Sequence, residues 1–178
     1  LFGSDPIIMA TVADRVKDPY DIIDINMGCP VVKVVRNGEG AALMKDVSLA
    51  SRIVETMVRV FGDKKPVTCK IRIGYDNNHI NAVEFAKAME TAGASAITVH
   101  GRTRSQLYSG TANWQYISKV KEVINIPLIV NGNIVSIDTA KQALYESGAD
   151  GVMIGRASLG KPWLLRDIDN TLNNKEGI

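Results

Sequence analysis

The sequence predicts an α/β fold, namely part of a parallel (β/α)8 TIM barrel that lacks its N-terminal strands. Two observations support this prediction. Strand-like and helix-like stretches alternate with short connections, which is typical of parallel strands joined by right-handed crossovers. In addition, four of the expected strands end in a polar side chain, and barrel sites are built from the ends of several strands.

The first expected strand covers residues 21–26, where β-branched residues are frequent and apolar and polar residues alternate. Further strands are expected at 67–73, 96–100, 127–131 and 151–154. The helical pattern predicts helices at 40–61, 81–92, 114–124 and 137–147, and a short helix that includes 163–168. Gly93 and Gly148 stand where helices commonly end, and Ser136 is a suitable N-cap.

The polar strand ends distinguish a barrel from an open sheet. Residues two apart in a strand point to the same face, so each strand presents its last polar side chain at the same edge. Asn26, Lys70, His100 and Asn131 are therefore expected to converge on one mouth. Because an open sheet normally confines its ligand to a single crevice, this pattern favours a barrel, although only five βα units are clear.

Cys29 is the strongest candidate for a catalytic residue. It lies in Asn26-Met27-Gly28-Cys29-Pro30, directly after the first strand, which places a thiol where barrels bind ligands. The alternative is a buried, inert cysteine in a tight turn. The flanking Asn, Gly and Pro favour the catalytic interpretation. Cys69 has the opposite strand parity to Lys70 and is expected to pack against a helix.

The last two strands are followed by Asn131-Gly132-Asn133 and Gly155-Arg156. In barrels, the loops after the seventh and eighth strands commonly bind phosphate through backbone N–H groups, and Arg156 could add a charge-assisted hydrogen bond. The alternative is two ordinary glycine turns with Arg156 in solvent. Both interpretations stay open on these residues alone.

Basic residues lie close to several strand ends. Lys70 stands among apolar residues, where it faces either an anionic or electron-rich ligand or, on an edge strand, water. His100 is followed by Arg102 and Arg104, which are either an anion-binding pair or solvated loop charges. The loop after Cys29 adds two further cations, Lys33 and Arg36.

Composition limits the remaining possibilities. With 178 residues, 46% hydrophobic and 22% charged, the chain matches one ordinary globular domain, and its net charge of +2 indicates no particular partner. Two cysteines and two histidines make a disulfide framework or a zinc site improbable, so we expect no metal and a reducing cytoplasmic location. No apolar run reaches the roughly 18 residues of a membrane span, so no membrane association is expected.

The chain resembles the tRNA-dihydrouridine synthases, specifically the bacterial B-type branch. The resemblance covers nearly the whole sequence in order, through the motifs NMGCP, VTCKIRIG, ITVHGRTRSQLYSGTANW, PLIVNGNI and DGVMIGRASLGKPWLL. Even the opening LFGSDP resembles the end of the third barrel strand of that family. The resemblance implies that residues 1–178 form an FMN-binding barrel domain running from the end of strand three through strand eight. The first strands and a C-terminal helical tRNA-binding domain would then be absent.

This resemblance implies reduction of uridine to 5,6-dihydrouridine in tRNA, with FMN as cofactor and NADPH or NADH as reductant. Hydride would come from the reduced flavin and the proton from Cys29. The implied cofactor-binding residues are Asn26, Lys70, His100, Asn131, Gly132, Asn133, Gly155 and Arg156. The expected tRNA contacts are Lys33, Arg36, Arg102 and Arg104, and the full-length protein is expected to be monomeric.

Two alternatives remain open at this stage. The first is another flavin barrel, such as a dihydroorotate or dihydropyrimidine dehydrogenase, which also pairs a Cys- or Ser-containing motif with a strand lysine. The HGRTRSQLYSG loop argues against it, because a free pyrimidine needs no polybasic rim. The second is an inactive truncated half-barrel.

Overall fold

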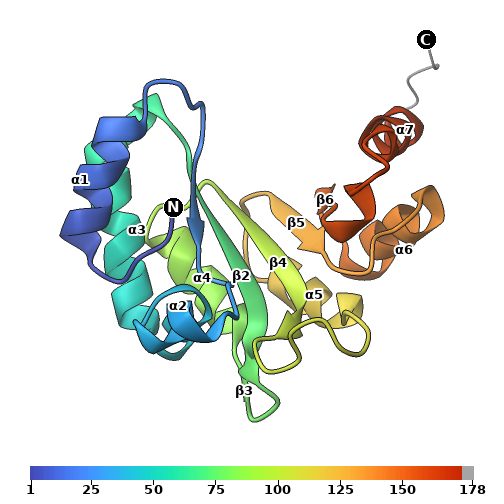
Figure 1. Cartoon of the computed structure of the whole chain (residues 1–178), viewed down its shortest axis with the longest axis horizontal. Coiled ribbons are helices and arrows are strands. Elements are labelled where there is room, and N and C mark those ends of the chain that lie inside the picture. The colour runs from blue at the N-terminus through green and yellow to red at the C-terminus, as the bar shows by residue number, and fades with distance from the viewer. Residues whose placement is uncertain (174–178) are drawn as a thin grey trace.

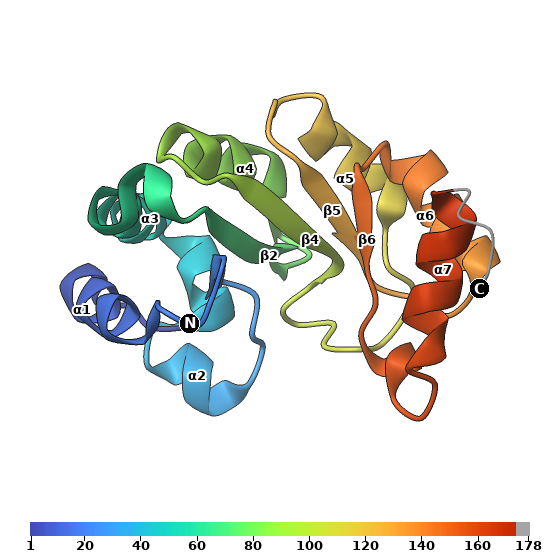
Figure 2. The same ribbon diagram turned by 90° about the horizontal axis from the view of Figure 1, so that it is seen from above.

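A curved parallel sheet with helices along its outer side forms the framework of the computed structural model, which describes residues 1–173 (Figures 1 and 2). The parallel strands lie in the order β1-β2-β4-β5-β6, and β3 pairs antiparallel with β2. Their bounds are β1 Ile23–Asn26, β2 Val67–Asp76, β3 His79–Ile80, β4 Ala96–Thr103, β5 Leu128–Asn131 and β6 Gly151–Met153. The predicted parallel α/β arrangement is confirmed.

The helices follow the strands as the βα pattern requires, and Figure 2 shows α3, α4, α5 and α6 along the outer side of the arc of strands. The α-helices are α1 Pro6–Val16, α2 Val32–Arg36, α3 Val47–Phe61, α4 Ala82–Thr91, α5 Trp114–Lys121, α6 Ile137–Ser147 and α7 Trp163–Leu172. Short 3-10 helices are η1 Gly40–Lys45, η2 Gly62–Lys64 and η3 Arg156–Ser158.

The helical predictions need correction at 40–61, at α1 and at α2, which lies in the segment expected to be a loop after Cys29. The single helix expected at 40–61 is divided into η1 and α3, because the Asp46 carboxylate accepts a hydrogen bond from Leu49 N and begins a new helix. Helix α1 was not predicted at all. Its start carries an N-cap and an N1 proline, since Asp5 accepts hydrogen bonds from Ile7 N and Ile8 N and Pro6 follows it.

The first residue of the chain pairs with the free edge of β1. The Leu1 amino group donates to Asp24 O at 2.7 Å, and Leu1 O accepts from Asn26 N at 2.8 Å. These are the two hydrogen bonds that a parallel neighbour makes with a strand. The pairing agrees with the expectation that the opening residues resemble the end of a barrel strand.

The hydrophobic core lies between the sheet and the outer helices. The strand side chains that face it are fully buried, namely Ile25, Cys69, Ile71, Ile97, Val99, Leu128 and Val130. Burial, together with the nearby Asp24 carboxylate, raises the pKa of the Cys69 thiol, which keeps it protonated. The prediction that Cys69 packs outward is confirmed. Strand alternation leaves Lys70 and Arg72 on the opposite, concave face.

Gly74 is required where β3 folds back on β2. A Cβ at this position would lie 2.2 Å from His79 O and 2.7 Å from Ile80 Cα. We expect Gly74→Ala to separate the β2–β3 hairpin and to lower the free energy of unfolding by about 1–3 kcal/mol, measured by chemical denaturation. Gly155→Ala is the matched control, because its Cβ would meet nothing within 4 Å. Equal stability of the two variants would contradict this assignment.

Candidate active site

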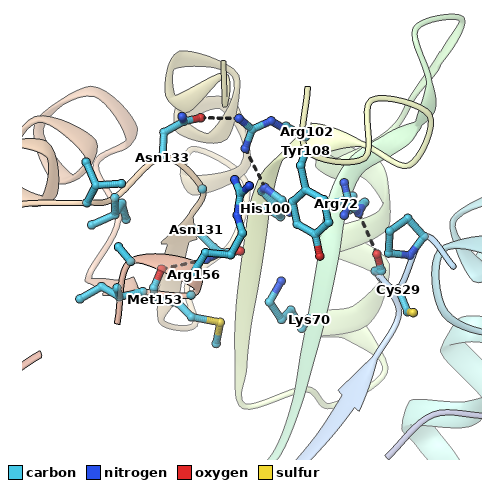
Figure 3. A pocket seen from close by; sticks show the side chains of 18 of the residues that line it. Cys29, Lys70, Arg72, His100, Arg102, Tyr108, Asn131, Asn133, Met153 and Arg156 are labelled. Carbon is cyan, nitrogen blue, oxygen red and sulfur yellow. Dashed lines mark hydrogen bonds between the residues drawn. The ribbon is translucent and has the colours of Figure 1, made fainter. Parts of the chain in front are cut away.

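The polar strand ends converge on one cavity of about 390 Å³ at the carboxyl edge of the sheet (Figure 3). Asn26, Lys70, His100 and Asn131 all line it, as the strand pattern predicted. Six further predicted residues line it too, namely Cys29, Arg102, Gly132, Asn133, Gly155 and Arg156. Lys33, Arg36 and Arg104 do not.

Parallel register explains this convergence. Neighbouring strands are aligned so that polar residues far apart in sequence become direct partners. Asn26 on β1 is the register partner of Lys70 on β2. Two residues further along β2, the residues aligned across β2, β4, β5 and β6 are Arg72, His100, Asn131 and Met153. Asn131 Nδ2 donates to Met153 O at 2.8 Å, which orients the amide at the end of β5.

The turn that carries Cys29 is held from both sides. Asn26 Oδ1 accepts hydrogen bonds from Gly28 N and Cys29 N, each at 3.0 Å, which closes a local turn. Arg72 Nε donates to Gly28 O at 2.7 Å. Behind the turn, Gly40 has a φ of +58°, and a Cβ there would lie 2.9 Å from Cys29 Cβ. Cys29 is therefore fixed, half-buried, at the β1 side of the cavity.

The cavity is strongly cationic. Four basic side chains line it, namely Lys70, Arg72, Arg102 and Arg156, and none of the described lining residues is Asp or Glu. Lys70 has no hydrogen-bond or ion-pair partner among the side chains that the structure describes. Burial, assisted by the charge of Arg72, lowers the pKa of Lys70 to about 8. This arrangement favours an anionic or electron-rich ligand beside the amine.

His100 is held neutral. Burial, together with the charges of Arg72 and Lys70, lowers the pKa of His100 to about 3. Arg102 Nη1 lies 3.3 Å from His100 Nε2. Because a guanidinium can only donate, Nε2 must accept, and the ring proton resides on Nδ1. His100 can therefore donate one hydrogen bond, and it carries no charge near neutral pH.

The sequence left Arg102 open between an anion-binding residue and a solvated loop charge, and the structure buries it. Its side chain is only 1% exposed. It donates to Ser109 O at 3.0 Å, to Gly110 O at 2.6 Å and to Asn133 Oδ1 at 2.8 Å. The solvated alternative does not hold for Arg102, because three fixed acceptors replace its water shell. In the structure it joins the loop after β4 to the loop after β5.

Gly132 and Asn133 organise the end of β5. Asn133 Oδ1 accepts from Ala112 N at 2.7 Å as well as from Arg102, so this oxygen is used within the protein. Gly132 has a φ of +110°, and a Cβ there would lie 2.8 Å from His100 Cδ2. Its conformation and the lack of space both require glycine.

Gly155 and Arg156 form the open side of the cavity. Both are exposed, and nothing lies within 4 Å of a Cβ added at Gly155, so a ligand can approach the backbone there. The Arg156 guanidinium lies 4.5 Å from the centroid of the Tyr108 ring and has no acidic partner among the described residues. Figure 3 shows Arg156 across the cavity from Cys29. A phosphate group fits this combination of charge and open backbone.

The basic residues that stay outside the cavity differ in setting. Lys33 and Arg36 lie exposed on α2, directly after the Cys29 turn. Arg104 follows the end of β4 and packs over Tyr75, with its guanidinium carbon 5.4 Å from the ring centroid. These three cations do not line the cavity, and the sequence did not distinguish them from the buried Arg102.

Among the lining residues that were not predicted, Arg72 and Tyr108 carry polar side chains. Arg72 lies on the same face of β2 as Lys70, so the alternation of side chains along the strand could have identified it as a lining residue. Tyr108 is 57% exposed and reaches the cavity from the irregular loop after β4. The residues of this loop follow neither a helical nor a strand pattern, so no sequence pattern could place the side chain.

No group of three or more His, Cys, Asp or Glu side chains suited to a metal ion occurs within the described residues. In the same part of the chain, no helix is long and apolar enough to cross a membrane.

Comparison with known proteins identifies close sequence relatives. The family described as "Dihydrouridine synthase (Dus)" matches residues 1–177. A "Probable tRNA-dihydrouridine synthase" from Rickettsia conorii is 49% identical over 177 residues, which are 99% of this chain and 53% of that protein. "tRNA-dihydrouridine synthase B" from Pseudomonas aeruginosa is 43% identical over 177 residues, with 99% of this chain and 53% of that protein covered. The chain thus spans about half the length of the curated relatives it matches.

Solved structures resemble the fold at low sequence identity. DHODH from Eimeria tenella aligns with a TM-score of 0.70 at 15% identity, covering 97% of this chain and 56% of that one. Histamine dehydrogenase from Rhizobium sp. 4-9 aligns with a TM-score of 0.71 at 16% identity, covering 93% of this chain and 27% of that one. These likenesses concern the fold alone, and they confirm the predicted partial barrel.

The buried amine of Lys70 predicts a distinctive pH dependence of stability. The folded chain releases this proton near pH 8, whereas an unperturbed lysine has a pKa of 10.5. The unfolded state therefore binds more protons between these values, and wild-type stability rises with pH across that window. Lys70→Met should stabilise the ligand-free chain at pH 7, and its advantage in unfolding free energy should shrink between about pH 8 and 10.5.

Chemical denaturation at several pH values measures this difference. Lys87→Met, which removes an exposed amine from α4, is the matched control and should show no such change. An advantage of Lys70→Met that is constant from pH 7 to pH 10.5 would contradict the burial of a charged amine.

Proposed function

Because this chain belongs to the dihydrouridine synthase family, we propose that the protein containing it reduces uridine to 5,6-dihydrouridine in tRNA. FMN is the proposed cofactor, and NADPH or NADH is the proposed reductant. The observation that carries this proposal is the cavity itself, in which four cations and no described carboxylate face a half-buried thiol. The names of the relatives supply the substrate class.

The residues of the cavity fit FMN. The unpaired Lys70 amine suits the electron-rich edge of an isoalloxazine ring, and an anion there would restore its pKa toward the ordinary value. His100 offers a neutral N–H donor beside it. The side-chain amides of Asn26 and Asn131 each use one polar atom within the described part of the chain, and the other atom can bind a ligand. Arg156, Gly155 and the backbone near Gly132 suit the phosphate. When bound, FMN supplies the hydride that reduces the C5=C6 bond.

The chain itself supplies the proton. Saturating the C5=C6 bond requires a proton at one carbon, and the Cys29 thiol is the acid positioned in the cavity. Arg72 and Asn26 hold the Cys29 turn through Gly28 O, Gly28 N and Cys29 N. In this proposal they position the thiol and exchange no proton with the substrate.

A uridine in RNA must leave its stack to enter a cavity of this kind. The exposed Lys33 and Arg36 on α2, together with Arg104, are proposed to hold the surrounding RNA backbone. Arg102 was expected to share this task. Its burial gives it the different role of orienting His100 and fixing the loop that carries Tyr108.

Replacing the thiol tests the proposed acid. Cys29→Ala should leave flavin binding and flavin reduction unchanged, because neither requires the thiol proton. Dihydrouridine formation should fall by roughly 10²–10⁴-fold, which is the usual contribution of a general acid. Single-turnover reduction of tRNA by the pre-reduced holoenzyme measures this loss. The assignment is wrong if the variant loses FMN while the remaining holoenzyme turns over normally.

Replacing Arg156 tests the proposed phosphate end. Arg156→Ala should weaken FMN binding by about 1.5–3 kcal/mol, because it removes a charged hydrogen bond to the phosphate. Binding of riboflavin, which has no phosphate, should change little. Flavin fluorescence titration measures both affinities. Arg166→Ala on α7, where Arg166 pairs with Asp167 at 3.0 Å, is the matched control. Equal weakening for FMN and riboflavin would exclude a phosphate contact.

A further inference from the structure

Two cations share one aromatic ring outside the cavity. Lys45 Nζ lies 4.9 Å from the centroid of the Tyr75 ring, and the guanidinium carbon of Arg104 lies 5.4 Å from the same centroid. Two positive charges brought to one ring repel each other, and the ring offsets only part of that cost. Such an arrangement is stabilised when an anion joins it.

Within the part of the chain that the structure describes, no carboxylate fills that role. Neither Lys45 nor Arg104 forms a salt bridge with any residue that the structure describes. The adjacent carboxylates are engaged elsewhere. Asp46 caps α3 through Leu49 N, and Asp76 accepts from Asn78 N and pairs with His79 at 2.7 Å.

Arg104 also carries an unused donor. Its Nε is buried and has no hydrogen-bond partner in the described part of the chain. A buried N–H without an acceptor is costly, and native proteins leave few of them. This observation is independent of the charge argument, and it shows that the described residues leave the Arg104 guanidinium incompletely satisfied.

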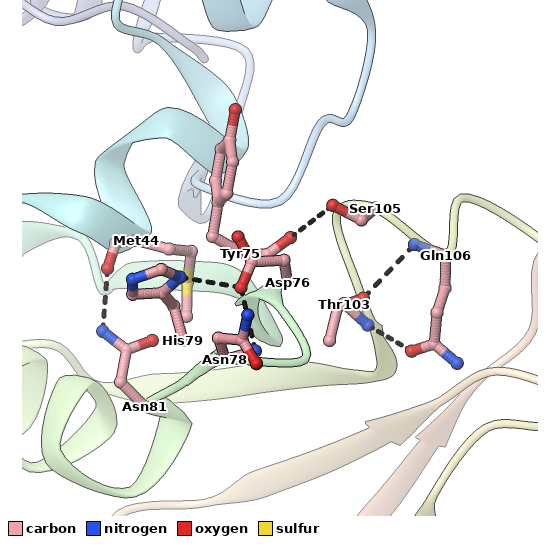
Figure 4. A network of polar contacts seen from close by, with 9 residues as sticks. All are labelled: Met44, Tyr75, Asp76, Asn78, His79, Asn81, Thr103, Ser105 and Gln106. Carbon is pink, nitrogen blue, oxygen red and sulfur yellow. Dashed lines mark hydrogen bonds and ion pairs between the residues drawn. The ribbon is translucent and has the colours of Figure 1, made fainter.

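Hydrogen bonds fix the backbone that carries these three side chains, and Figure 4 shows part of this network around Tyr75 and Met44. Arg104 N donates to Gly74 O and Ser105 N donates to Tyr75 O, each at 3.0 Å, so the end of β4 is fixed to the end of β2. Asn81 Nδ2 donates to Met44 O at 2.8 Å, which anchors the end of η1 next to Lys45. The cluster is therefore prepared before a ligand arrives.

The cluster lies beside the active site. Tyr75 follows the cavity-lining Arg72 by three residues on β2, which is roughly 10 Å of strand. Arg104 follows the cavity-lining Arg102 by two residues. A polymer that places a base in the cavity would carry its neighbouring phosphates across this surface.

We propose that Lys45, Tyr75 and Arg104 form a phosphate-binding subsite that holds the RNA backbone next to the uridine in the cavity. The inference rests on the proposed function, because that function makes RNA the polymer at the mouth. Tyr75 positions the two cations, and Lys45 and Arg104 contact the phosphodiester oxygens.

The test is binding of unmodified tRNA to the flavin-loaded protein that contains this chain, measured over a range of salt concentrations. Lys45→Met/Arg104→Met should reduce the slope of log K against log salt by roughly one to two units, because each lost phosphate contact contributes about 0.7–0.9. The flavin spectrum should not change. Lys87→Met/Lys119→Met is the matched control, since both residues are exposed on the outer helices and Lys119 also lies over a tyrosine, at 5.8 Å.

The ring is tested separately. Tyr75→Leu should weaken tRNA binding by about three- to tenfold at fixed salt, because both cations lose their common support. Tyr75→Phe, which keeps the ring, should bind as the wild type does. Equal weakening by both substitutions would overturn the positioning role of the ring.

Two further results would overturn the inference, and they are distinguishable. If the wild type binds tRNA and the Lys45/Arg104 variant matches the control pair, the subsite is wrong while the proposed function stands. If the wild type binds no tRNA at all, the proposed function fails and the subsite fails with it.

Discussion

The guanidinium of Arg72 connects the parts of the active site. Its Nε donates to Gly28 O at 2.7 Å, in the turn that carries Cys29. Its Nη1 donates to Thr103 O at 2.8 Å, at the end of β4, and to Leu107 O at 3.2 Å, in the loop that carries Tyr108. One buried side chain on β2 thus joins both neighbouring strand ends. Backbone carbonyls are suitable partners here because they satisfy the donors without neutralising the charge.

That retained charge determines the electrostatics of the cavity. Arg72 contributes to lowering the pKa of Lys70 to about 8 and of His100 to about 3, in both cases after the larger effect of burial. Unpaired buried cations oppose folding and favour an anionic ligand, so stability and binding are in conflict at this site. An apolar residue of similar size at position 70 would stabilise the folded chain more than the lysine does. Ligand binding explains why a lysine occupies this position.

Arg102 and Arg104 show how one strand end can give two arginines different tasks. Both residues follow His100 within four positions, yet Arg102 is almost fully buried with four polar contacts inside the protein. Arg104 instead packs on Tyr75 and keeps an unused donor. In the proposed function, Arg102 stabilises the loops around the flavin site. Arg104 belongs to the surface on which RNA would lie.

The local sequence pattern determined the strands, their parallel order and the convergence of Asn26, Lys70, His100 and Asn131. These features depend on strand alternation and on the βα repeat, which are properties of consecutive residues. The outward packing of Cys69 followed from the same alternation. The family motifs, also read from the sequence, agree with the relatives found by comparison.

Only the tertiary structure decided the burial of Arg102, the role of Arg72 and the approach of Lys45 to Tyr75. Each depends on acceptors or rings from segments distant in sequence, such as Asn133 for Arg102. No pattern of neighbouring residues encodes where such partners lie. Whether a charge faces water or backbone carbonyls is decided by which loops pack against it, and that packing exists only in the folded chain.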